Sequence, residues 1–207
     1  RLVGFSLPMP TEAVENCVAP AHYPQALKDR ARKHASHLIM YYAGHETATI
    51  EQYVSLAAVG GALSRLGACV ILNEAGHTSF PAAALAESDD GDVLDLLRTL
   101  PLPILYCGFV KYEVQGTEGV WMRTHGAQLF GLPNFAVHAE GHHQGQEQFD
   151  RVTTILSYLN EAKATVAQGH TMEIGPDDLI RLRAPTPFEP FLQDENPLLV
   201  IESIDHI

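Results

Sequence analysis

The stretch "NFAVHAEGHHQGQEQF", residues 134–149, contains histidines and carboxylates that are close enough in sequence to bind a metal or to catalyse a reaction together. Imidazole nitrogens and a carboxylate are suitable zinc ligands, and an open coordination position on such a metal activates water. If the stretch folds back on itself, His138, His142 and His143 would be the zinc ligands. Glu140 would then be the general base. These residues define one hypothesis, a metal-dependent hydrolase with a histidine-rich loop.

The competing interpretation of this stretch is a hydrated loop between a strand and a helix. The spacing of the three histidines fits no established ligand motif. Gly141 and Gly145 also make the loop costly to order, because flexible glycine backbone must be fixed to hold ligands. We therefore favour no metal and no cofactor, and we assign no catalytic residue. The sequence favours a protein that is not an enzyme, and the zinc hydrolase is the alternative.

A second group of polar residues occupies two tight connectors elsewhere in the chain. Thr124, His125 and Gly126 stand together at the end of one expected strand, and His170 follows Gly169 in a turn. If the fold brings these connectors near residues 138–143, a polar pocket rich in histidine results. The sequence therefore predicts ligand binding at Thr124, His125, Gly126 and His170.

Short apolar runs and one regular helix would position these residues. Residues 134–140 are expected to form a strand, and residues 146–162 a helix with apolar side chains at 3.6-residue spacing. Residues 104–114 and 120–124 are expected to form a hairpin, and residues 79–100 one or two helices. Residues 178–183 and 198–204 are expected to add edge strands.

The expected fold class is α+β, a sheet with helices packed on it. Two strand–helix–strand units, residues 37–74 and 134–167, suggest ferredoxin-like halves. No sharp linker divides the 207 residues, so we expect a single domain over 1–207. Within it, residues 185–197 form an irregular proline-rich segment, and residues 198–204 form the terminal strand.

Charge and composition exclude several classes of partner. The formal net charge is −12, from 25 acidic against 13 basic residues, which argues against nucleic-acid binding. No apolar run reaches the length of about 20 residues that a membrane helix needs, so no membrane partner is expected. The three cysteines are far apart and form no CxxC motif, which is typical of a reducing, cytoplasmic compartment. The expected partner is a protein or a small ligand.

Four stretches together resemble a known family: "MPTEAV", "HASHLIMYY", "THGAQLFGLPNFAV" and "LNEAKATVAQGHTMEIG". In this order they resemble a bacterial family known as domain of unknown function 4261, over about residues 8–184. The family's Thr-x-Gly and Phe-Gly pattern corresponds to Thr124, Gly126, Phe130 and Gly131. His170 stands where the family has an acid. The resemblance implies a bacterial, cytoplasmic, single-domain protein, and it provides no catalytic role that could be carried over. The favoured function is a protein- or small-ligand-binding module.

Overall fold

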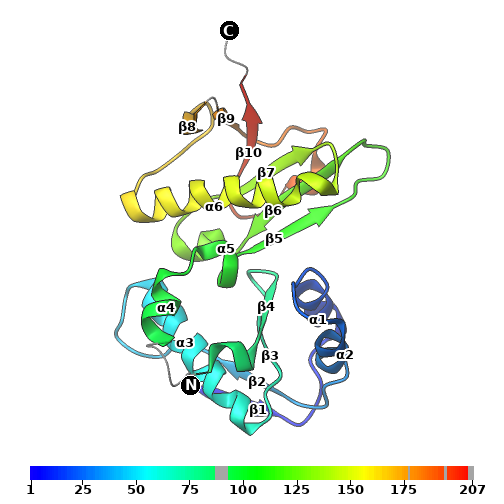
Figure 1. Cartoon of the computed structure of the whole chain (residues 1–207), viewed down its shortest axis with the longest axis vertical. Helices are drawn as coiled ribbons and strands as arrows, with labels where there is room; N and C mark the ends of the chain where they lie inside the picture. Colours follow the sequence, from blue (N-terminus) through cyan, green and yellow to red (C-terminus); the bar gives the residue numbers. More distant parts are fainter. Residues whose placement is uncertain (87–92, 177, 194, 205–207) are drawn as a thin grey trace. The chain divides into compact units, whose positions relative to one another are not determined.

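The computed structural model describes residues 1–86, 93–176, 178–193 and 195–204. The chain divides into two compact units, residues 1–100 and residues 101–207 (Figure 1). Each unit has its own helices and sheets, which confirms the predicted α+β class. The single domain over residues 1–207 stays a prediction.

The first unit contains two separate two-stranded sheets among short helices. Its elements are β1 (Leu2–Phe5), α1 (Thr11–Val18), α2 (Gln25–Arg32), β2 (His37–Met40), α3 (Thr49–Leu63), η1 (Ser64–Leu66), β3 (Val70–Asn73), β4 (Thr78–Pro81), η2 (Ala82–Leu85) and α4 (Val93–Thr99). β1 pairs antiparallel with β2, and β3 pairs antiparallel with β4.

This pairing corrects the first of the two predicted ferredoxin-like halves. β2 and β3 flank α3 as expected, but they lie in different sheets. The cause is local hairpin formation, because β3 finds its partner only five residues along the chain, in β4. β4 also replaces the beginning of the one or two helices expected over residues 79–100. The middle of that expected helix, residues 87–92, lies outside the described residues.

Two glycines let α3 approach its neighbours closely. A side chain on Gly60 would overlap that of Ile71 in β3, and a side chain on Gly61 would overlap the carbonyl group of Leu85 in η2. Both glycines are buried, together with Val54 and Ala57 on the same helix. The packing of α3 therefore depends on the absence of side chains at these two positions.

The second unit is a six-stranded mixed sheet with one long helix. Its elements are α5 (Leu102–Leu105), β5 (Gly108–Tyr112), β6 (Val120–His125), η3 (Ala127–Phe130), β7 (Asn134–Ala139), η4 (His142–Gln144), α6 (Gly145–Ala162), β8 (Thr171–Gly175), β9 (Asp178–Arg183), η5 (Pro190–Leu192) and β10 (Leu198–Ser203). The strand order is β5-β6-β7-β10-β9-β8. Only β7 and β10 run parallel. The expected strands 134–140, 178–183 and 198–204 are thus present. The prediction that the last two are edge strands is wrong, because β9 pairs with β10 and β8, and β10 pairs with β7 and β9.

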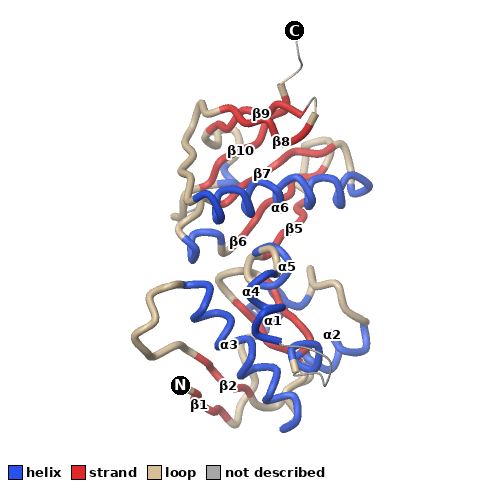
Figure 2. Tube along the Cα trace, turned by 60° about the vertical axis from the view of Figure 1, so that its left-hand side comes forward, coloured by secondary structure: helices blue, strands red, loops and turns tan. Residues whose placement is uncertain are grey.

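α6 covers one face of this sheet (Figures 1 and 2). Its buried apolar residues are Val152, Ile155, Leu156 and Leu159. The pairing register gives one sheet face the apolar side chains of Met122, Phe135, Val137, Leu199, Ile201, Ile180 and Leu182. Because every one of these side chains is buried, this face and α6 form the main core of the unit.

The opposite face is more polar and is partly covered by η5, within the proline-rich segment. Leu192 from η5 packs with Trp121, Ala136 and Val200 in a small apolar cluster. Residues 185–193 and 195–197, the described part of the proline-rich segment, form no strand, as the prolines predict. Among the described helices of the chain, none is long and apolar enough to cross a membrane.

Candidate functional site

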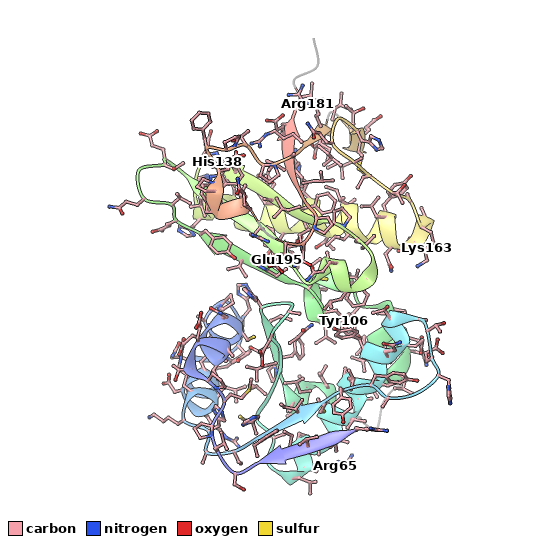
Figure 3. All side chains as sticks on the ribbon, turned by 180° about the vertical axis from the view of Figure 1, so that it is seen from behind. Arg65, Tyr106, His138, Lys163, Arg181 and Glu195 are labelled. Atoms are coloured by element: carbon pink, nitrogen blue, oxygen red, sulfur yellow. The ribbon has the colours of Figure 1, made fainter. Side chains whose placement is uncertain are left out.

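The three histidines of the predicted zinc site make separate contacts. His138 donates a hydrogen bond of 2.8 Å from Nε2 to the carbonyl oxygen of Glu118. His142 lies in η4 and pairs through Nε2 with a Glu113 carboxylate oxygen at 2.7 Å. His143 follows and is exposed. Figure 3 shows His138 on the sheet as seen from behind.

No described residues form the predicted metal cluster. Within the part of the chain that the structure describes, no group of three or more His, Cys, Asp or Glu side chains is placed to hold a metal ion. Glu140, the predicted general base, is exposed at the end of β7. The geometry therefore does not bring His138, His142 and His143 to one point.

Thr124 has a structural role that the sequence analysis missed. Its hydroxyl is fully buried, accepts a hydrogen bond of 2.8 Å from the Phe135 backbone N–H and donates one of 3.3 Å to the Asn134 side chain. Asn134 in turn accepts from the Ala127 N–H and donates to Gln128. These contacts fix the connection between β6 and β7.

The neighbouring glycines of the family pattern belong to the same connection. Gly126 has φ 91° and Gly131 has φ 74°, and they enclose η3 on either side. Both values lie in the left-handed region, where glycine is favoured. The Thr-x-Gly and Phe-Gly pattern thus encodes a tight turn between two central strands.

Replacing Thr124 with valine is expected to lower the free energy of unfolding of the second unit by about 1–3 kcal/mol, because the buried N–H of Phe135 loses its acceptor. Urea denaturation followed by the fluorescence of Trp121, the only tryptophan, measures this loss. Thr154→Val on the exposed side of α6 is the matched control and should change stability by less than about 0.5 kcal/mol. Equal losses in the two variants would contradict this role.

His125 and His170 lie far apart in the sheet. His125 ends β6 and contacts the Tyr112 hydroxyl in β5 through Nε2. His170 precedes β8, where its carbonyl oxygen accepts a hydrogen bond from the Leu182 N–H at 2.8 Å. β6 and β8 are four strand positions apart, or about 19 Å at roughly 4.8 Å per strand. The two connectors are therefore not joined in one pocket, and ligand binding at either stays a prediction.

A polar cleft of about 480 Å³ lies at another place, where β7 and β10 end. Both parallel strands finish at this edge of the sheet, and α6 begins there after the short turn of η4. Its lining residues are Trp121, Val137, His138, Ala139, Glu140, Gln144, Glu147, Gln148, Arg151, Arg183, Val200, Ile201, Glu202 and Ser203. The predicted residues His138 and Glu140 are thus part of a cleft, although not of a metal cluster.

Gln148 is the most unusual side chain of this cleft. It is 5% exposed, and its Oε1 atom is buried with no hydrogen-bond partner among the described residues. Gln148 stands on the buried side of α6, one turn before Val152. Gln144, one turn earlier, differs, because its Oε1 accepts a hydrogen bond of 2.7 Å from the Glu140 N–H.

Both arginines in the cleft wall are paired with carboxylates. Arg151 forms two hydrogen bonds with Asp178 and one of 3.1 Å with the Ser203 hydroxyl. Arg183 donates to Glu202 at 2.7 Å, and to both carboxylate oxygens of Glu189 at 2.6 and 2.7 Å. The two guanidinium groups are therefore largely occupied by the protein itself.

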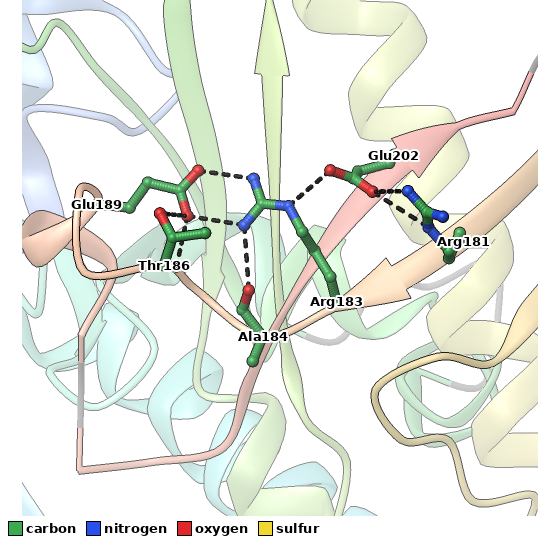
Figure 4. Close-up of polar contacts among 6 residues, drawn as sticks. All are labelled: Arg181, Arg183, Ala184, Thr186, Glu189 and Glu202. Atoms are coloured by element: carbon green, nitrogen blue, oxygen red, sulfur yellow. Dashed lines mark hydrogen bonds and ion pairs between the residues drawn. The ribbon is translucent and has the colours of Figure 1, made fainter.

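The contacts of Arg183 belong to a network that joins three segments (Figure 4). Glu202 on β10 also accepts hydrogen bonds from Arg181 on β9, and Glu189 accepts from the Thr186 N–H. The pKa of Glu189 is lowered mainly by its hydrogen bonds with Arg183. The pKa of Glu202 is lowered by hydrogen bonds with Arg181 and then Arg183. The network attaches residues 186–189 to the strands beside the cleft.

Two carboxylates of the cleft have no such partner. Glu140 and Glu147 are both exposed, and no described residue forms an ion pair or a side-chain hydrogen bond with either carboxylate. They lie on opposite sides of the turn that joins β7 to α6. The arginines of the cleft are therefore neutralised by carboxylates of the protein, whereas the carboxylates of Glu140 and Glu147 are free to accept hydrogen bonds.

Sequence reasoning did not single out Gln148, Arg151, Arg183 or Glu202. One signal for Gln148 was available: it falls in the apolar stripe of α6, four residues before Val152 and seven before Ile155. Burying a polar side chain in an apolar stripe is unfavourable unless a hydrogen bond compensates for the lost contact with water. The arginines gave no comparable signal, because their partners come from distant segments.

The geometry defines the second unit as an α+β domain with a mixed sheet and a cleft at the ends of its parallel strands. Residues 123–202 of this unit match the model of the family described as Domain of unknown function (DUF4261). The predicted family resemblance is thereby confirmed for this segment, which continues beyond residue 184, whereas for residues 8–122 it stays a prediction. Comparisons with curated proteins and with solved structures gave no match.

Proposed function

We propose that the second unit is a binding module for a small polar ligand, which occupies the cleft at the ends of β7 and β10. Ligands of open sheets bind outside the carboxyl ends of parallel strands, where the chain connections diverge. Here β7 and β10 run parallel and both end beside the cleft, where β7 continues into α6. The volume of about 480 Å³ also falls in the range of small-molecule sites.

The observation that carries this proposal is the buried amide of Gln148. A buried polar atom without a partner destabilises a fold by about 1–3 kcal/mol. An apolar side chain would fill the same position on α6 without this cost. The presence of glutamine in the wall of a cleft is explained if a ligand completes its hydrogen bonds.

Replacing Gln148 with methionine tests the proposal without knowledge of the ligand. Methionine has a similar length and no amide, so the free energy of unfolding of the ligand-free protein should rise by about 1 kcal/mol. Gln144→Met is the matched control, and it should lower stability because the Glu140 N–H loses its acceptor. Urea denaturation followed by Trp121 fluorescence measures both changes.

The opposite result for Gln148 would refute the proposal. If Gln148→Met destabilises the protein as Gln144→Met does, the amide of Gln148 contributes to the fold. No ligand is then required to explain why a glutamine occupies this position in the cleft wall.

A further inference from the structure

We infer that the ligand of this cleft is a small organic cation that presents N–H donors, such as a primary amine or a guanidinium group. The inference rests on the proposed function and specifies its ligand class. It follows from which charged groups of the cleft are occupied and which are free.

The basic groups of the cleft offer little to an anion. The guanidinium of Arg183 is hydrogen-bonded to Glu189, Glu202 and the Ala184 carbonyl oxygen through Nε, Nη1 and Nη2. The side chain of Arg151 is only 13% exposed and already contacts a carboxylate and a hydroxyl. A carboxylate or phosphate ligand would have to displace these internal partners.

The free groups of the cleft are acceptors. The carboxylates of Glu140 and Glu147 have no partner among the described residues, and the wall beside them contains Gln148, whose buried amide oxygen has no donor. Two unused carboxylates in one cleft, with an unpaired amide oxygen in its wall, favour a ligand that brings hydrogen-bond donors. The carboxylates are charged, which favours a ligand with positive charge.

The dipole of α6 opposes this preference but is weaker. The first turn of a helix behaves as roughly half a positive charge, which attracts anions. Glu140 and Glu147 place two full negative charges beside the same turn. The carboxylates therefore determine the sign of the local potential. The net charge of −12 reinforces the attraction of cations over longer distances.

Three probes with the same four-carbon chain separate the ligand classes. Putrescine carries a cation at each end, succinate a carboxylate and 1,4-butanediol a hydroxyl. Calorimetric titration at an ionic strength of about 0.15 M, where the Debye length is about 8 Å, should show binding of putrescine and no binding of succinate. The Glu140→Gln, Glu147→Gln double variant should bind putrescine at least about tenfold more weakly.

A second double variant controls for net charge. Glu161→Gln with Glu173→Gln removes the same charge at exposed positions outside the cleft, and it should leave putrescine affinity within about twofold of the wild type, because exposed distant charges are screened by salt. An equal loss of affinity in the two double variants would overturn the inference, since attraction would then be nonspecific.

The remaining outcomes separate the inference from the proposed function. If succinate or butanediol binds in preference to putrescine, and Gln148→Met abolishes that binding, the inference is overturned and the proposed function stands. If no probe binds at millimolar concentration, the inference is likewise overturned. The proposed function is then judged by the stability of Gln148→Met alone.

Discussion

Replacing Arg183 with methionine is expected to lower the free energy of unfolding of the second unit by about 2–4 kcal/mol at neutral pH. Removing the guanidinium leaves the carboxylates of Glu189 and Glu202 without their shared cation. These side chains are only 13% and 32% exposed, so water compensates for the lost ion pairs only in part. Breaking a fully buried ion pair costs about 3–5 kcal/mol, and partial exposure reduces this. Urea denaturation followed by Trp121 fluorescence measures the difference.

The effect of Arg183→Met should depend on pH in a defined direction. The pKa values of Glu189 and Glu202 are lowered in the folded protein. Their contribution is therefore fully present above the unfolded carboxyl pKa of about 4.3, and it is lost as pH falls through the lower folded values. The difference in the free energy of unfolding between the wild type and Arg183→Met should accordingly become smaller below about pH 4.

Arg181→Met is the matched control for the Arg183 prediction. Arg181 contacts the same Glu202, but its side chain is 57% exposed. Such exposed pairs contribute about 0–1 kcal/mol. A loss of stability in Arg181→Met as large as in Arg183→Met would show that the attachment of residues 186–189 through Glu189 does not stabilise the fold.

Replacing Gly61 with alanine is expected to destabilise the first unit by about 1–3 kcal/mol. In an ordinary helix this change stabilises by up to about 1 kcal/mol. Here the added Cβ would overlap the Leu85 carbonyl group and lie 2.9 Å from the Ala86 nitrogen, so backbone would have to move. Because the only tryptophan lies in the second unit, circular dichroism during thermal unfolding is the suitable measurement.

Gly60→Ala provides the comparison on the same helix. Its Cβ would meet the side chains of Ile71 and Met40, which can rotate. Gly60→Ala should therefore destabilise less than Gly61→Ala. The reverse order would contradict the close approach of α3 to η2.

Local patterns predicted much of the second unit. The apolar spacing from Phe149 to Leu159 predicts a helix over residues 146–162, and α6 spans Gly145–Ala162. The hairpin of residues 104–114 and 120–124 appears as β5 and β6, with α5 replacing the first residues. These elements depend on neighbours in sequence, which periodicity and turn residues report directly.

The cleft could not be predicted in this way. It exists because β10 enters the sheet between β7 and β9, which are far apart in sequence. The pairing of Leu198 with Asn134 and of Val200 with Arg183 has no local signature. The sequence indicated the histidines as a possible site because imidazole groups bind metals. The side chain with the clearest functional signal in the structure is instead Gln148, within an apolar stripe.

The most direct test of the ligand site is chemical-shift mapping of backbone amides in the second unit, with the three four-carbon probes and a low-molecular-mass fraction of a cell extract. The proposed site predicts that the shifts concentrate at residues 139–148 and 201–203 and disappear in Gln148→Met. Shifts centred on residues 124–131 or on His170, unchanged in that variant, would contradict it.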